Sequence, residues 1–135
     1  MGADADVIRR LTNETFLGGD VSLIDELVAD DYVDHDPPPG IAGTKEGYRQ
    51  LADMVIGAFS DRKAVFDDFI DTTDGRVVEN WMMTAKHTGE AFGVPPSNQE
   101  VQVRGVEIFR CAGGKVVEHW GAVDMGDVMM KAAGP

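Results

Sequence analysis

Two pairs of long β-rich runs constrain the fold of this chain most strongly. The first pair, KAVFDDFIDTTDGRVVENWMMTAKHTG, meets at Asp74-Gly75, and the second, VQVRGVEIFRCAGGKVVEHWGAVD, meets at Gly113-Gly114. Both dipeptides favour the backbone angles of a tight hairpin turn. The pattern therefore predicts four antiparallel strands in two hairpins, and strands of this length tend to twist and curl.

Helical spacing dominates the chain before these strands. Apolar residues recur at helical intervals in residues 4–18, in residues 21–29, and from Thr44, a suitable helix cap, to about Phe59. The segment 30–43, DDYVDHDPPPGIAG, holds three consecutive prolines and is expected to be a loop. Helices followed by antiparallel strands predict an α+β fold, in which a curved sheet and helices along one side form a cone.

Length and composition exclude several classes of protein. The 135 residues suit one domain over 1–135, and no apolar run approaches the roughly 18 residues of a membrane span. A net charge of −12 with only 12 Lys and Arg residues argues against nucleic-acid binding. One cysteine excludes an internal disulfide, and the acidic N-terminus lacks the apolar region of a secretory signal. We therefore expect a cytoplasmic protein with no nucleic-acid or membrane partner.

The acidic residues are unevenly distributed. Residues 1–75 hold 17 of the 24 acids, whereas residues 76–135 hold seven. Acids are few in this second half of the chain, so Glu107, Glu118 and Asp124 are individually informative, because burial in a sheet disfavours a charged carboxylate.

The last strand, VVEHWGAVD, separates its polar residues between two faces. Side chains alternate along a strand, so Glu118, Trp120 and Asp124 share one face while His119 points to the other. A Trp between carboxylates is suited to line a pocket in which an acid is poorly hydrated and its pKa rises. The alternative is that Glu118 faces solvent, Trp120 belongs to the core and Asp124 ends the strand.

The three histidines, His35, His87 and His119, are candidates for proton transfer, because the imidazole pKa lies close to physiological pH. Their separation matches no metal-ligand spacing, so no metal site is predicted. Structural hydrogen bonding explains each of them equally well. Asp34, next to His35, suits either a role in orienting a catalytic group or ordinary turn chemistry.

Further residues suit the wall of a ligand site. Asn80, Trp81 and Met82 lie together in the second strand, although core packing explains the methionine equally well. The segment 90–100, EAFGVPPSNQE, contains Phe92 and is long enough to reach over a pocket mouth. Nucleophile, phosphate-loop and dinucleotide motifs do not occur in the sequence, so no cofactor is expected.

The stretches YVDHDPPPGIAGTKEGYRQ, HTGEAFGVPP, VRGVEIFR and GGKVVEHWGAVD resemble the successive signatures of the SnoaL-like polyketide cyclases. That family belongs to the nuclear transport factor two-like superfamily. The resemblance implies a cone-shaped, cystatin-like α+β fold, with three N-terminal helices packed on a curved, mostly antiparallel sheet of four to six strands.

The resemblance also implies a cofactor-free intramolecular aldol condensation, with a carboxylate of the last strand as the acid/base. That role falls on Asp124. In the family that this chain resembles, many members carry an acid directly after the Trp, where this chain has Gly121. If that position is the catalytic one, Asp124 is structural, and His35, His87 and His119 remain as the acid/base candidates.

Together these features predict a cofactor-independent cyclase, lyase or isomerase that acts on a small hydrophobic oxygenated molecule. Asp124 and His119 are the leading acid/base pair, although alternation opposes them unless Gly121 introduces a bulge. His87 is an equally good partner for Asp124. Glu107 and Glu118 are expected to help bind the substrate, with Trp120, Trp81, Asn80, Met82 and Phe92.

The alternative is a non-catalytic protein of the same fold that binds small molecules or acts as a dimeric scaffold. Alternating valines and Phe109 give the strands apolar surface on both faces, and three helices cover only one of them. We therefore expect a homodimer formed through the outer face of the sheet.

Overall fold

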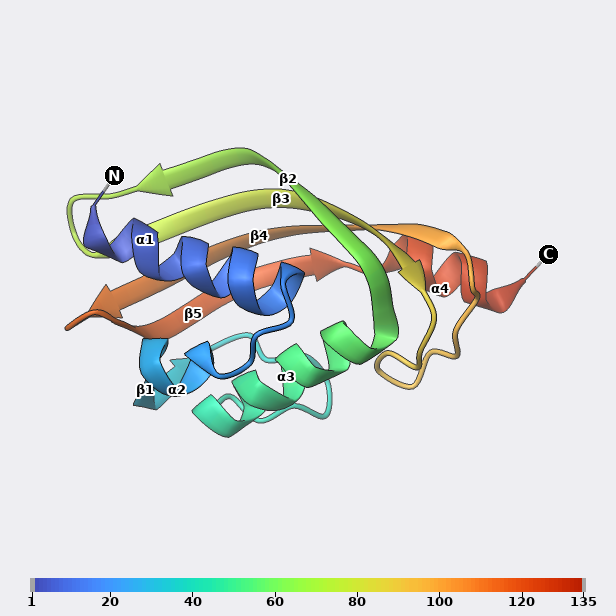
Figure 1. Ribbon diagram of the computed structural model, residues 1–135, viewed down its shortest axis with the longest axis horizontal. Coiled ribbons are helices and arrows are strands. Elements are labelled where there is room, and N and C mark those ends of the chain that lie inside the picture. The colour runs from blue at the N-terminus through green and yellow to red at the C-terminus, as the bar shows by residue number, and fades with distance from the viewer. Residues whose placement is uncertain (1, 135) are drawn as a thin grey trace.

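The computed structural model describes residues 2–134 as a curved five-stranded sheet with helices on its concave side (Figure 1). The helical elements are α1 (Ala3–Arg10), the π-helical η1 (Leu11–Leu17), α2 (Leu23–Leu27), α3 (Lys45–Ala58) and α4 (Gly126–Ala133). The strands are β1 (Val28–Asp34), β2 (Phe59–Asp71), β3 (Arg76–His87), β4 (Glu100–Ala112) and β5 (Lys115–Asp124). Their order is β1-β5-β4-β3-β2, with β1 parallel to β5 and the other neighbours antiparallel. This architecture confirms the predicted α+β fold.

The two hairpins form at the predicted turns. Gly75, Gly113 and Gly114 have φ angles of 85°, 61° and 78°, a region in which a side chain would be strained. The third predicted helix is also confirmed as α3. The Thr44 side chain accepts a hydrogen bond from the backbone N–H of Gly47, 3.2 Å away, and so caps its first turn.

The sequence-based prediction was wrong for residues 28–34. They form β1 rather than the end of a helix and the start of a loop, and β1 ends before the three prolines begin. Val28 lies opposite Val116, and Asp34 opposite His119, along β5, so β1 forms an edge of the sheet. Pairing with β5 decides the structure of this segment, a long-range contact that local sequence patterns do not contain. Helix α4 was also not predicted.

Two apolar clusters make up the core. The first joins the helices α1, α2 and α3 and the π-helical η1 to the sheet; it contains Ile8, Leu11, Ile24, Tyr32, Tyr48, Val77, Phe109 and Val116. The second lies where α4 packs, with Val128 fully buried among Phe59, Met83, Ala85, Val101 and Val103. Within residues 2–134, no helix combines the length and the apolar character needed to cross a membrane.

One register shift sets which face each residue of β5 occupies. Cys111 pairs with Val116 but Arg110 pairs with Glu118, so Val117 is an extra residue in β5. Pairing beyond this bulge is regular, and Gly121 lies opposite Glu107 without a second shift. His119 and Gly121 therefore face the helices, whereas Glu118, Trp120 and Asp124 face away from them.

Candidate functional site

His119 lies at the centre of a buried polar cluster on the concave face. Its Nδ1 atom lies 2.9 Å from Oδ1 of Asp34, which ends the neighbouring strand β1. Its Nε2 atom lies 3.3 Å from Oε1 of Glu107 on β4, within ion-pair distance but outside hydrogen-bond geometry. Nε2 is therefore a buried ring nitrogen without a hydrogen-bond partner among residues 2–134. Only 11% of the His119 side chain is exposed.

Glu107 connects His119 to two residues of β3. Its Oε2 atom accepts a hydrogen bond from Nε1 of Trp81, 3.1 Å away. Its cross-strand neighbour is Glu79, which is 2% exposed and whose Oε1 accepts a hydrogen bond from the Thr12 hydroxyl, 2.8 Å away. Trp81 borders the second apolar cluster, whereas His119 packs against Phe109 of the first. The polar cluster therefore lies between the two apolar parts of the core.

Burial and neighbouring charges set the protonation of this cluster. Burial alone would lower the pKa of His119, but contacts with Asp34 and Glu107 and the charges of these two residues raise it to about 9. Burial would raise the pKa of Asp34, but the hydrogen bond and the positive charge of His119 hold it below its ordinary value. Burial and the nearby Glu107 raise the pKa of Glu79 to about 8. At neutral pH His119 is therefore a cation, Asp34 an anion and Glu79 a neutral acid.

Two glycines leave room for the rings of this cluster. A Cβ atom at Gly105 would lie 2.4 Å from Cζ2 of Trp81, so the indole lies directly over the backbone of β4. A Cβ atom at Gly121 would lie 3.0 Å from Nε2 of His119. The backbone N–H of Gly121 donates a hydrogen bond to Oδ2 of Asp36, 3.0 Å away. The absence of side chains at these two positions thus keeps space beside the unpartnered ring nitrogen.

Several predicted site residues lie on the opposite face of the sheet. His35 stacks on Trp120 with 4.8 Å between ring centroids, and its Nε2 atom lies 2.7 Å from Oε2 of Glu118. Glu118 also pairs with Arg110, and these two contacts lower the pKa of Glu118. Asn80 and Met82 also point outward from β3, and the amide of Asn80 donates a hydrogen bond to Asp68. The structure therefore separates this outer group from His119.

The remaining predicted residues lie at the ends of strands. Asp124 is exposed, and its Oδ1 atom accepts a hydrogen bond from the backbone N–H of Gly126 at the start of α4. His87 is fully buried at the end of β3, stacked on Phe59, and neither of its ring nitrogens has a partner among the described residues. Phe92 lies partly buried in the following loop beside the second apolar cluster. Of the predicted acid/base residues, only His119 belongs to the concave polar cluster.

Glu79 and Thr12 are members of the site that sequence reasoning missed. Glu79 alternates with Val77 and Trp81 along β3, so strand alternation alone was enough to place it on the inner face. Thr12 lies in a helical segment that looked entirely structural. No cluster of three or more His, Cys, Asp and Glu side chains that could hold a metal ion occurs in the part of the chain that the structure describes.

Comparisons with known proteins agree with this architecture. The family model of the SnoaL-like polyketide cyclases matches residues 6–131. No curated protein matches the sequence.

Several solved structures are similar over nearly the whole chain. IdmH, a putative polyketide cyclase from Streptomyces antibioticus, is 28% identical with a TM-score of 0.77, and the match covers 96% of this chain and 98% of that one. AclR, a putative hydroxylase from Streptomyces galilaeus, is 26% identical with a TM-score of 0.78, over 97% of this chain and 80% of that one. A putative SnoaL-like polyketide cyclase from Jannaschia sp. CCS1 is 24% identical with a TM-score of 0.82, over 98% and 93% of the two chains, and shows the shared fold. Because the family model covers nearly the whole chain, this protein belongs to the SnoaL-like polyketide cyclase family.

Proposed function

We propose that the protein is a cofactor-independent acid/base catalyst that closes a ring, or performs a related lyase or isomerase step, on a small hydrophobic oxygenated substrate. The observation that carries the proposal is the buried His119 cation, whose Nε2 atom has no hydrogen-bond partner within residues 2–134. A buried donor without an acceptor is costly in a protein interior. A substrate oxygen at this position would satisfy it.

Glu107 and His119 supply the two groups that an aldol reaction needs. A hydrogen on the carbon between two carbonyl groups is already acidic, so one carboxylate is sufficient to remove it. Glu107 takes this proton, while Nε2–H of His119 donates a hydrogen bond to the enolate oxygen. The 3.3 Å separation between Glu107 Oε1 and His119 Nε2 places both groups beside the same few substrate atoms. Attack of the enolate carbon on a second carbonyl then forms the new bond, and the resulting alkoxide takes up the proton that Glu107 removed, which restores the carboxylate.

Asp34 acts as a positioning residue in this scheme. Its hydrogen bond to Nδ1 fixes the orientation of the ring and favours the protonated imidazole. Glu107 is 21% exposed, twice the 10% of the Asp34 side chain, and is therefore the carboxylate that a ligand reaches more readily.

The proposal is tested by deuterium exchange at the activated carbon of an aryl β-keto ester, followed by NMR in D2O. We expect the parent protein to accelerate exchange above the buffer rate, and His119→Gln and Glu107→Gln each to slow it by about 100-fold or more. His35→Gln is the matched control, because His35 lies on the outer face. If the parent binds the ester without accelerating exchange, the binding-protein alternative replaces this proposal. If His119→Gln exchanges as fast as His35→Gln, the assignment of the catalytic histidine is wrong.

A further inference from the structure

Arg9 differs from the other arginines of the chain. Its guanidinium lies over the ring of Phe69, 4.1 Å from the centroid, and has no hydrogen-bond or ion-pair acceptor within residues 2–134. The other six arginines donate to carboxylates or backbone carbonyls: Arg10, Arg49, Arg62, Arg76, Arg104 and Arg110. In a chain with a net charge of −12, an arginine held in place without an anion is unexpected.

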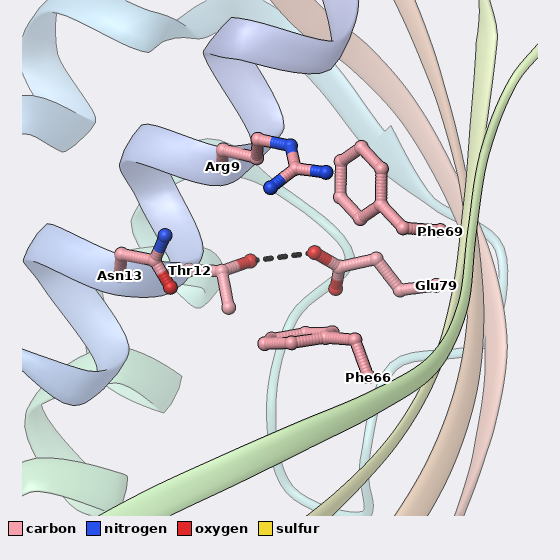
Figure 2. Close-up of a pocket in the computed structure, with 6 residues that line it drawn as sticks. All are labelled: Arg9, Thr12, Asn13, Phe66, Phe69 and Glu79. Carbon is pink, nitrogen blue, oxygen red and sulfur yellow. Dashed lines mark hydrogen bonds between the residues drawn. The ribbon is translucent and has the colours of Figure 1, made fainter.

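The Arg9 side chain lies at a pocket between the first helical segment and the sheet. Arg9 comes from α1, Thr12 and Asn13 from η1, Phe66 and Phe69 from β2, and Glu79 from β3. Figure 2 shows the Glu79 carboxyl reaching toward the helix between the two phenylalanine rings, with the Arg9 guanidinium beside Phe69.

The pocket volume limits what can enter it. The volume is about 100 Å³, whereas benzene occupies an engineered cavity of about 150 Å³ and most ligand sites measure about 300–1,000 Å³. The pocket therefore suits one small substituent of a ligand rather than a ring.

The polar groups of the pocket suit a negatively charged substituent. Arg9 supplies the positive charge, and the amide of Asn13 can donate hydrogen bonds. Burial and the charge of Glu107 keep Glu79 protonated at neutral pH, so Glu79 adds no negative charge and can itself donate. Phe66 and Phe69 are partly buried and supply apolar walls, while Arg9 and Asn13 are exposed at the pocket mouth, where a ligand can reach them from solvent. A planar guanidinium pairs well with a carboxylate or a phosphate, and the small pocket volume favours the smaller carboxylate.

We infer that the pocket formed by Arg9, Asn13 and Glu79 binds a carboxylate substituent of the ligand. The inference rests on the proposed function only in treating that ligand as the substrate. Glu79 lies opposite Glu107, and Glu107 opposite Gly121, so the pocket is two strand spacings, about 10 Å, from the strand that carries His119. The reacting carbon lies between Glu107, one strand spacing from Glu79, and His119, so the substrate class is a hydrophobic carbonyl compound with a carboxylate about 5–10 Å from its reacting carbon.

Acetate tests the site without requiring any catalysis. Titration of acetate into the full-length 15N-labelled protein at pH 6.5 is expected to produce saturable shifts at Arg9 Nε and at the backbone N–H groups of Thr12 and Asn13. Acetamide, which has the same shape but no charge, is expected to produce none. Arg9→Met should weaken acetate binding by roughly tenfold, as the loss of one charge-assisted contact does. Arg104→Met is the matched control, because Arg104 pairs with Asp67 in an exposed contact.

A second variant tests the role of Glu79. Acetate affinity of the parent should fall between pH 6.5 and pH 8.5 as Glu79 ionises, and Glu79→Gln should remove this fall. The groups that influence the Glu79 carboxyl are Glu107, Arg9 and His119, with Thr12 as its hydrogen-bond donor, and all four are retained in the variant.

Three results would overturn the inference. The first is that acetate leaves the signals of Arg9, Thr12 and Asn13 unshifted. The second is that Arg9→Met binds acetate as tightly as Arg104→Met does. The third is that chloride binds as tightly as acetate, which would indicate an adventitious ion only. A protein that binds acetate at Arg9 but does not accelerate exchange of the β-keto ester would refute the proposed function and leave the carboxylate site standing.

Discussion

Replacing Glu79 by glutamine should stabilise the protein, and the gain should increase as the pH rises. Glutamine retains an oxygen that can accept the Thr12 hydrogen bond, but it cannot ionise. The pKa of the Glu79 carboxyl rises from 4.5 to about 8 on folding. The raised pKa means that the folded state holds this proton more tightly than the unfolded chain does. The stability that depends on the protonated acid is therefore fully present below pH 4.5 and is lost as the pH rises through 8.

The size of the effect follows from proton linkage. Ionising Glu79 costs about 5 kcal/mol more in the folded protein than in the unfolded chain, which is an upper bound because the folded structure can relax. The free-energy gain of Glu79→Gln over the parent should grow from about 2 kcal/mol at pH 6 to nearly 5 kcal/mol at pH 9. The raised pKa of His119, about 9, makes stability fall over the same range in both proteins. The variant should therefore keep part of the parent's pH dependence.

Urea unfolding monitored by circular dichroism between pH 6 and pH 9 measures this difference. Glu90→Gln is the control, because Glu90 is an exposed carboxyl in the loop between β3 and β4. Parallel stability curves for the parent and Glu79→Gln would refute the reasoning, since they would mean that Glu79 ionises as easily in the folded protein as in the unfolded chain.

Three further predictions concern the cluster, the packing beside it and the outer face. Asp34→Asn should lower the pKa of His119 from about 9 toward 6.5, because it removes the negative charge that stabilises the imidazolium cation. The 15N shifts of the imidazole measure this pKa, and an unchanged titration of His119 would contradict the prediction. Gly105→Ala should destabilise the protein by about 1–3 kcal/mol and alter the near-ultraviolet circular dichroism, since its Cβ would lie 2.4 Å from an indole carbon. Gly57→Ala, where a Cβ meets nothing within 4 Å, should instead stabilise α3 by about 0.5–1 kcal/mol. If both substitutions destabilise the protein, the steric explanation is wrong. We expect a second copy of the chain to cover the outer face of the sheet, where Val106 is 47% exposed. Sedimentation should therefore show a dimer for the parent protein and a monomer for Val106→Glu. A monomeric parent would refute this prediction.

The predictable parts of the fold are those determined by local chemistry. The glycine turns fix both hairpins, and the Thr44 cap with its apolar spacing fixes α3. Strand β1 could not be predicted in this way, because Val28–Asp34 becomes a strand only by pairing with β5, more than eighty residues later in the chain. The three prolines that follow β1 indicate where the strand must end, but they carry no information about the structure of the residues before them.

The site was predictable only in part, for a similar reason. Alternation correctly placed His119 and Asp124 on opposite faces, but it does not reveal which face the helices cover. Gly121 carries no side chain and lies directly opposite Glu107. The carboxylate that approaches His119 comes from β4, which only the pairing of the two strands reveals.

The extra residue at Val117 has a consequence for how this sheet can change in length. Regular pairing onward from Cys111 and Val116, without the bulge, would place Glu118 opposite Phe109 and Trp120 opposite Glu107. Trp120 would then enter the interior and the imidazole would emerge into water. Deleting Val117 removes the extra residue and the bulge together, so it should leave Arg110–Glu118 and every later pair unaltered. One bulge thus decides which side of the sheet holds the ionisable group.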